Sequence, residues 1–118
     1  MPLTSVNRIE IEQVLLNLMK NAIDAMSSQA RRELRLATRL IKSGMIMVTV
    51  SDTGTGIPRD ELDKVFNPFQ TTKQNGLGLG LSICRSLIEN YGGRIWAEQR
   101  SDCGMEFNFT LPVVVMYE

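Results

Sequence analysis

A long helical pattern from Arg8 to Ser28 constrains the fold of this chain more than any other feature. The stretch contains no Pro or Gly, and its apolar residues recur at helical spacing over a wide arc. We expect this helix to be largely buried, and therefore to be covered by other elements of the fold. The residues of the arc are Ile11, Val14, Leu15, Leu18, Met19, Ala22, Ile23 and Met26.

Two strand patterns follow this helix. Between Glu33 and Ile41 one set of alternate residues is mainly leucine, which is typical of a half-buried strand. Met45 to Val50 is almost continuously apolar, which indicates a strand covered on both faces or central in its sheet. Because the turn Lys42-Ser43-Gly44 separates them, the two strands are predicted to form a hairpin.

The second half of the chain repeats the order of helix and hairpin, with no internal sequence repeat. It begins with a predicted loop over Asp52–Pro58, a short helix to Phe66 and an aperiodic segment Asn67–Gly76. A helix is predicted over Leu79–Tyr91, with one stripe formed by Leu79, Ile83, Leu87 and Tyr91, and it stops at Gly92-Gly93. Two strands are predicted over Arg94–Arg100 and Met105–Leu111, and Pro112 ends the second. This order predicts an α+β fold in which the helices pack on one face of a mostly antiparallel sheet.

The amino-acid composition excludes several classes of site and partner. The 118 residues include 13 Lys and Arg, 13 Asp and Glu, two Cys and no His. One domain is expected, and the absence of His excludes a His nucleophile, a His base and imidazole-bound zinc. Balanced charge without a basic run disfavours nucleic acid and anionic membranes as partners. Because no apolar stretch approaches ~18 residues and no signal peptide pattern opens the chain, we expect a soluble, cytoplasmic protein.

Two Gly-rich segments suggest a site for phosphates. Gly54 and Gly56 follow a predicted buried strand, and Gly76, Gly78 and Gly80 open a predicted helix. Glycine lets a backbone approach a ligand closely, and the free N–H groups at a helix N-terminus favour an anion. Neither segment has the spacing of the P-loop or of the dinucleotide fingerprint. Each segment alone is also compatible with a plain turn before a helix.

Three polar residues extend this hypothesis. Asp52 ends the buried strand, so its carboxylate needs a hydrogen-bond donor, which an adenine amino group could supply. Asn17 and Asn21 are four residues apart and therefore lie on one face of the first helix. Their side chains either cap neighbouring loop backbone or offer an oxygen to Mg²⁺, a hard ion that shares phosphate oxygens.

These residues fall in four segments that resemble the catalytic ATP-binding domain of bacterial sensor histidine kinases. The segments look like the N, G1, F and G2 boxes of that family, in the family's order, and the resemblance covers about residues 7 to 112. Asn21 to Met26, and Thr71-Thr72-Lys73 before a short lid, look most like the nitrogen-regulation and oxygen-sensing branch. The boxes are Asn17-Leu18-Met19-Lys20-Asn21-Ala22, Asp52-x-Gly54-x-Gly56-Ile57-Pro58, Phe66-x-Pro68-Phe69 and Gly76-x-Gly78-x-Gly80-Leu81.

The resemblance implies the Bergerat fold, a two-layer sandwich shared with gyrase, chaperone and mismatch-repair ATPases. It implies that ATP and Mg²⁺ bind between the two long helices under a mobile lid. By the same resemblance, Asn21 coordinates Mg²⁺ with support from Asn17, and Asp52 accepts a hydrogen bond from the adenine amino group while Gly54 and Gly56 lie against the ring. The phosphates would be bound by Gly76, Gly78 and Gly80, with Lys73 at the γ-phosphate. Phe66 and Phe69 would anchor the lid, and the pocket would be completed by Ile57, Thr72, Leu77, Leu79 and Leu81. Phe66 and Phe69 are equally compatible with plain core aromatics.

The chain departs from the family pattern at two points. Family members usually carry a strand before the first helix and a dimerisation segment with a phosphoacceptor His, whereas residues 1–118 read as a single catalytic domain without them. Asn17 stands where ATP-hydrolysing relatives have a Glu base, and an amide cannot take a proton from water. The resemblance therefore implies a kinase acting on a His of a separate segment, and indirectly on a response regulator. The isolated chain is expected to be inactive without that His.

Two other functions remain open from the sequence. One is a regulatory module that binds nucleotide or docks a partner without transferring phosphate, and the other is a gyrase-like or chaperone-like ATPase, which Asn17 disfavours. Val113 to Val115 is either an extension of the last strand or an exposed apolar edge where a missing partner segment docks.

Overall fold

The computed structural model describes residues 2–3, 8–27, 29–41, 44–57, 59–66, 77–100, 104–112 and 114–115. The two main helices are α1 and α2, with a short 3-10 helix, η1, between them in sequence. The elements are β1 (Pro2–Leu3), α1 (Arg8–Ala25), β2 (Leu34–Ile41), β3 (Met45–Asp52), η1 (Arg59–Lys64), α2 (Leu77–Asn90), β4 (Ile95–Gln99), β5 (Met105–Pro112) and β6 (Val114–Val115). The predicted helices and hairpins are all present, and the short helix is a 3-10 helix.

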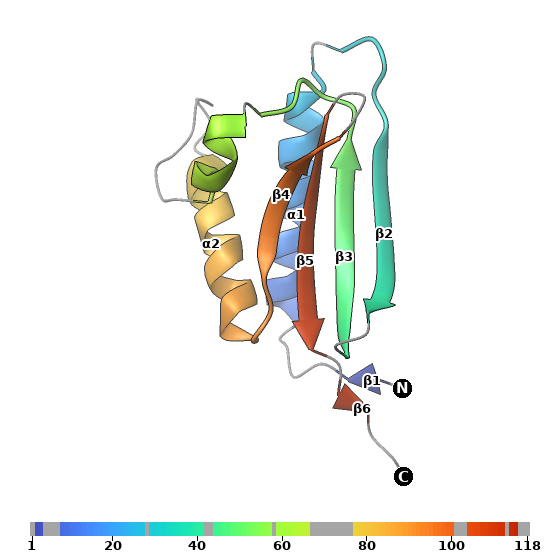
Figure 1. Cartoon of the computed structure of the whole chain (residues 1–118), viewed down its shortest axis with the longest axis vertical. Helices are drawn as coiled ribbons and strands as arrows, with labels where there is room; N and C mark the ends of the chain where they lie inside the picture. Colours follow the sequence, from blue (N-terminus) through green and yellow to red (C-terminus); the bar gives the residue numbers. More distant parts are fainter. Residues whose placement is uncertain are drawn as a thin grey trace.

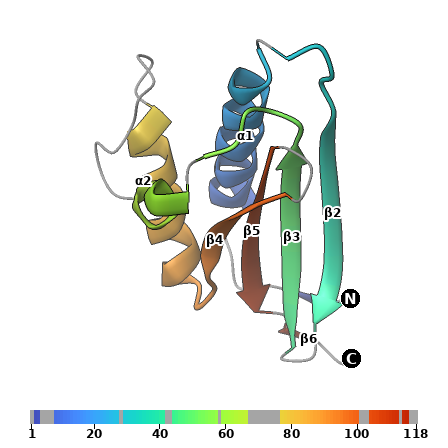
Figure 2. The same cartoon turned by 45° about the horizontal axis from the view of Figure 1, so that its top comes forward.

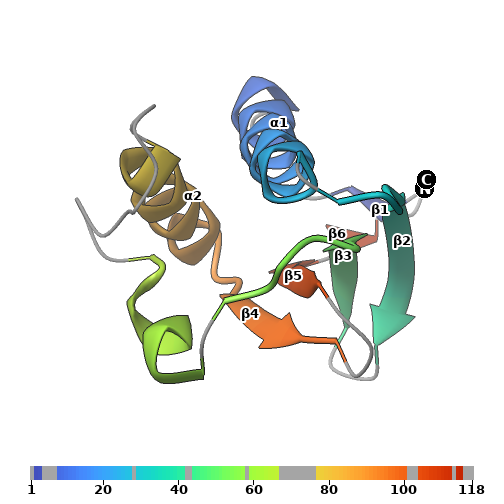
Figure 3. The ribbon, with the colours of Figure 1, turned by 90° about the horizontal axis from the view of Figure 1, so that it is seen from above.

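Four strands form the main sheet in the order β2-β3-β5-β4, and each described pair is antiparallel. Helices α1 and α2 lie side by side on one face of this sheet, which leaves the other face open (Figures 1 and 3). The predicted two-layer α+β architecture is therefore confirmed. Because β3 has a neighbour on each side, its apolar run is that of a central strand, as expected.

The core lies between the helices and the middle of the sheet. Phe107 and Phe109 of β5 are at most 1% exposed and point toward the helices, where they meet buried residues of α1 and α2. The helix residues in this cluster are Val14, Leu18, Ala22, Leu81, Cys84 and Ile88. Alternate residues of a strand lie on one face, so burial of these two rings assigns the opposite, open face to Asn108 and Glu106.

Two sequence expectations about burial were wrong. Strand β2 is not half-buried, since residues from Leu34 to Leu40 are all exposed. Ile23, placed in the buried arc of the first helix, is 56% exposed. Of the stripe predicted on the second helix, Leu87 and Tyr91 pack against the core while Ile83 is 46% exposed, and the buried residues of α2 are Leu81, Cys84 and Ile88. In each case the pattern predicted the element correctly, but the positions of its neighbours decided which side was covered.

The ends of the described chain meet in a second, small sheet. β1 pairs antiparallel with β6, so that Pro2 lies opposite Val115 and Leu3 opposite Val114. Figure 1 labels both strands below the main sheet, and Figure 2 shows β6 at the same end. Val114 and Val115 thus form a short strand, while Val113 lies outside the described residues. Strand β5 also includes Pro112, which is paired with Met45, rather than ending before it. None of the described helices is long and apolar enough to cross a membrane.

Candidate functional site

Three elements that carry the predicted site converge at one end of the molecule. The C-terminal end of β3, the C-terminal end of α1 and the first turn of α2 all lie at the upper end in Figure 1. The loop after β3 packs closely on α1, because a Cβ added to Gly54 would lie 2.6 Å from the carbonyl oxygen of Ala25. The Asp52 segment and the end of α1 are therefore joined directly.

Asp52 is held at this end by main-chain hydrogen bonds. Its side chain is 1% exposed, and its Oδ1 accepts from the N–H of Gly54 at 2.8 Å and from that of Met105 at 3.3 Å. The chain itself thus supplies donors to this carboxylate, because Met105 lies beside the end of β3, and a further bond from an adenine amino group stays a prediction. These donors stabilise a carboxylate in a buried position.

The turn between β4 and β5 also supports the main chain of Asp52. Arg100 donates from its Nη1 to the carbonyl oxygen of Asp52 at 3.0 Å. Gly104 lies so close to that carbonyl that an added Cβ would fall 2.0 Å from its oxygen. Arg100 and Gly104 are site-positioning residues that sequence reasoning missed, since they lie about fifty residues from Asp52 and belong to no motif.

The two glycines after Asp52 each have a structural reason that is independent of a ligand. Only glycine fits at Gly54, because a side chain there would clash with the backbone of Ala25. Gly56 has a φ of +81°, which L-residues rarely adopt, and faces the side chain of Gln99. Ile57 packs against the core. Close approach of these glycines to an adenine ring therefore stays a prediction.

Thr53 joins this loop to the start of β2 and was also missed. Its hydroxyl donates to the carbonyl oxygen of Arg31 at 2.9 Å and accepts from the N–H of Glu33 at 3.0 Å. The residue is 1% exposed and also contacts the sulfur of Met26 at the end of α1. A Thr directly after a strand-ending Asp is a local signal for such a side-chain turn, and it could have been noted from the sequence.

The two asparagines of α1 lie on the side of the helix that faces α2. Asn17 donates from Nδ2 to the sulfur of Cys84 at 3.6 Å, and Asn21, one turn later, is buried. Burial raises the pKa of the Cys84 thiol, and the Asn17 amide partly opposes that change. A second link between the helices runs from the Tyr91 hydroxyl, which donates to Glu10. The contact of Asn17 is thus with the second helix rather than with a loop.

The remaining predicted site residues fall into two groups. Phe66 is buried and packs edge-to-face on Phe107, with ring centroids 6.1 Å apart, so it is a core aromatic in this structure. Leu77, Gly78, Leu79 and Gly80 form the first turn of α2, and Leu81 joins the core. Phe69, Thr72, Lys73 and Gly76 lie outside the described residues.

The groups gathered at this end fit a magnesium nucleotide better than a metal ion alone. Among the described residues no three His, Cys, Asp or Glu side chains form a metal cluster, and a hard cation such as Mg²⁺ commonly takes water and phosphate oxygens as further ligands. A buried carboxylate on β3 and a buried amide on α1 supply an acceptor and an amide oxygen. The first turn of α2 supplies N–H groups that a helix leaves without intrahelical partners. These are the groups that an adenine base, a hard cation and phosphates would use.

Comparison with known proteins agrees with this geometry. Residues 6–115 match the family model described as histidine kinase-, DNA gyrase B-, and HSP90-like ATPase. The chain is 48% identical over 110 residues to the sensor protein FixL of Bradyrhizobium diazoefficiens, and the match covers 93% of this chain and 22% of FixL. The chain thus spans about a fifth of the length of this curated relative.

Solved structures give the same result. The catalytic domain of histidine kinase ThkA is 41% identical with a TM-score of 0.79, and the match covers 91% of this chain and 68% of that one. ThkA has also been solved in complex with the response regulator TrrA. Full-length ShkA, solved in complex with AMPPNP, is 28% identical with a TM-score of 0.78, over 92% of this chain and 22% of ShkA.

Proposed function

Since the chain belongs to the family of histidine kinase-, DNA gyrase B- and HSP90-like ATPases, we propose that it binds Mg²⁺-ATP and donates the γ-phosphate to a His on a separate segment. It is a catalytic domain of the sensor histidine kinase type. The observation that carries the proposal is the convergence of buried Asp52, buried Asn21 and the first turn of α2 at one end of the fold.

Each part of the proposed site has a role that its chemistry supports. The carboxylate of Asp52 accepts a hydrogen bond from the adenine amino group, and its bonds to Gly54 and Met105 hold it in place for this role. The side-chain oxygen of Asn21 coordinates Mg²⁺, with Asn17 in support. The N–H groups in the first turn of α2 bind the phosphates, because they have no partner within a helix.

The same residues favour phosphoryl transfer over hydrolysis. Transfer depends mainly on positioning and on neutralising charge, which a bound cation supplies when present and which Lys73 would assist. Asn17 has no basic atom to take a proton from water, so a water molecule is not activated here. The chain has no His, so the acceptor His lies on another segment, as in a sensor kinase dimerisation segment. A response regulator is the indirect partner, by similarity to ThkA.

A titration of Asp52→Asn against the unchanged chain tests the adenine assignment. The variant keeps one side-chain oxygen for the N–H groups of Gly54 and Met105 but can place an amide where adenine needs an acceptor. Loss of a charged acceptor is worth roughly 1.5–3 kcal/mol, so we expect ADP to bind about 10- to 150-fold more weakly by calorimetry. Asp60→Asn, on exposed η1, is the matched control and should leave affinity unchanged. Equal affinity in the Asp52 variant would contradict the assignment.

A second experiment separates the kinase from a regulatory module. ADP and a non-hydrolysable ATP analogue are titrated with and without Mg²⁺, and the chain is then supplied with a His-bearing dimerisation helix and radiolabelled ATP. We expect binding that strengthens with Mg²⁺, loss of that dependence in Asn21→Ala, and label on the His. Binding without label on a verified cognate helix would favour a nucleotide-binding module that docks a partner.

A further inference from the structure

Strand β2 is a free edge of the main sheet. It stands first in the order β2-β3-β5-β4 and pairs only with β3 among the described strands. Seven of its eight residues, from Leu34 to Leu40, are exposed. A long edge strand presents unpaired N–H and C=O groups, and proteins usually shorten, bend or cover such an edge. Within the described chain nothing covers this one.

This edge also carries large apolar side chains on its helix-side face. Leu36 lies opposite Val50, and Leu40 opposite Ile46, so both leucines share the face on which Val50 enters the core. They are nevertheless 52% and 70% exposed. Helix α2 packs on β4 and β5, and α1 packs mainly on β3 with fewer contacts to β2, which lies at the far side of α1 from α2 in Figure 3. Leu34, 38% exposed, continues the row.

We propose that this edge is a self-association surface, at which β2 of a second copy of the chain pairs antiparallel with β2 to extend the sheet across a two-fold axis. Backbone hydrogen bonds would then form along both edges, and the exposed leucines of the two copies would cover one another. The proposal concerns a different part of the molecule from the nucleotide site and does not depend on it.

The side chains of β2 select one register for this pairing. Directly opposite residues in an antiparallel pair point to the same face, so a two-fold axis must pass beside a single residue. An axis at Thr38 places Leu36 opposite Leu40 of the second copy, twice, on the helix-side face. On the open face it places Arg39 opposite Ala37 and Arg35 opposite Ile41.

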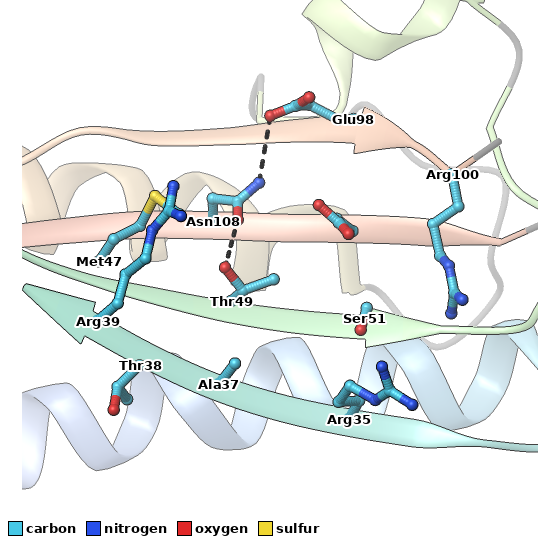
Figure 4. Close-up of a pocket in the computed structure, with 11 residues that line it drawn as sticks. Arg35, Ala37, Thr38, Arg39, Met47, Thr49, Ser51, Glu98, Arg100 and Asn108 are labelled. Atoms are coloured by element: carbon cyan, nitrogen blue, oxygen red, sulfur yellow. Dashed lines mark hydrogen bonds between the residues drawn. The ribbon is translucent and has the colours of Figure 1, made fainter. Parts of the chain in front are cut away.

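The neighbouring register is worse in the charges that it brings together. An axis at Ala37 would set Arg35 opposite Arg39 of the second copy, twice, and like charges directly opposite are destabilising. It would set Leu36 opposite Thr38 and Leu34 opposite Leu40 of the second copy, twice, so both registers form two pairs of leucines. Figure 4 shows Arg35 and Arg39 on the same strand with Ala37 between them, at the rim of a cavity of about 400 Å³ on the open face. The charges of Arg35 and Arg39 therefore favour the axis at Thr38, whereas the leucine pairs do not separate the two registers.

The helices do not obstruct this arrangement. A two-fold axis perpendicular to the sheet keeps α1 of both copies on the same face. Helix α1 packs mainly against β3 and has fewer contacts with β2, so two copies of α1 would be separated by somewhat less than three strand spacings, about 12–14 Å. That distance exceeds the 8–10 Å or so at which packed helices meet. The alternative occupant of the edge is an extended peptide of another protein, but a peptide would not explain why the strand complements itself.

The first test is sedimentation of the native chain from micromolar to millimolar concentration, together with Leu40→Ala and the matched control Leu16→Ala. Leu16 is 61% exposed, on the solvent side of α1, about 100° from Asn17 which contacts α2. We expect a monomer–dimer equilibrium whose dissociation constant rises about tenfold in Leu40→Ala, because the side chain is lost twice per dimer, and does not change in Leu16→Ala. A native chain that stays monomeric, or a dimer weakened only by Leu16→Ala, overturns the proposal.

The second test determines which residues of the two β2 strands lie opposite one another. Ala37→Glu places a carboxylate opposite Arg39 of the second copy and should tighten the dimer about fivefold, whereas Ala37→Lys should weaken it. With the axis at Ala37 the Ala37→Glu variant would set like charges together and weaken it instead. Thr38→Cys should form a disulfide-linked dimer on mild oxidation, since opposed Cα atoms lie about 4.5–5.5 Å apart, with the native chain as control. Tightening by Ala37→Glu and cross-linking by Thr38→Cys together support the proposal, and weakening by Ala37→Glu or no cross-link overturns it.

Discussion

Strands β5 and β2 carry the same kind of alternation and end in opposite environments. On β5, Met105, Phe107, Phe109 and Leu111 are between 0% and 6% exposed. On β2, Leu34, Leu36 and Leu40, on the same face of the sheet, are 38% to 70% exposed. The difference comes from position, because β5 has a strand on each side and both helices above it, whereas β2 is an edge. Alternation identifies the face of a strand, but the neighbours determine whether that face is buried.

The largest effect on stability should come from truncating a buried side chain of β5. Phe107→Ala removes a ring that packs on Phe66 and is 1% exposed, so we expect a loss of about 3–5 kcal/mol in the free energy of unfolding. Urea denaturation followed by circular dichroism measures it. A loss below ~1 kcal/mol would show that the core near the candidate site is not packed as described.

The two hairpin turns give the next comparison. Gly104 between β4 and β5 and Gly44 between β2 and β3 both have positive φ, +91° and +77°. An added Cβ at Gly104 would meet the Asp52 carbonyl at 2.0 Å, whereas at Gly44 it would meet nothing within 4 Å. We expect Gly104→Ala to cost about 2–4 kcal/mol and Gly44→Ala about 1–2 kcal/mol by the same denaturation assay. Equal losses of unfolding free energy in the two variants would mean that the positive φ alone causes the destabilisation, and that the close contact with the Asp52 carbonyl adds nothing.

The buried thiol between the helices should make stability depend on pH. Burial raises the pKa of Cys84, so the folded chain keeps its proton while the unfolded thiol releases it above pH ~8.5. The stabilising contribution is complete below that pH and is lost as pH rises, by at most ~1.4 kcal/mol per pH unit. Urea titrations at several alkaline pH values should show a steeper fall in the native chain than in Cys84→Ala. Parallel slopes would contradict the burial of the thiol.

The smallest effect on stability should come from truncating an exposed leucine of the edge strand β2. Leu36→Ala removes the same class of apolar contact as the β5 variant, but from a side chain that is 52% exposed. At concentrations where the chain is a monomer we expect a change within about 0.5 kcal/mol in the free energy of unfolding. A loss near that of Phe107→Ala would mean that β2 is covered within one copy.

Sequence reasoning reached most of the fold but only part of the site. The helical pattern of residues 8–28 and the apolar run of β3 were sufficient because local periodicity reports secondary structure directly. The C-terminal ends of α1 and β3, which carry Asn21 and Asp52, and the first turn of α2 lie at one end of the molecule in Figure 1. The contacts of Arg100, Gly104 and Met105 with Asp52 were not foreseen, since they join residues about fifty positions apart.

The sequence by itself determined the class of fold, the order of its elements and the four motifs that identify the family, because these depend on short spacings along the chain. Only the tertiary structure decided that Asp52 is held by the turn between β4 and β5, that Asn17 bonds to Cys84, and that the leucines of β2 stay exposed. These outcomes depend on which elements become neighbours in space, and on how far the two helices extend across the sheet. A one-dimensional pattern contains neither quantity.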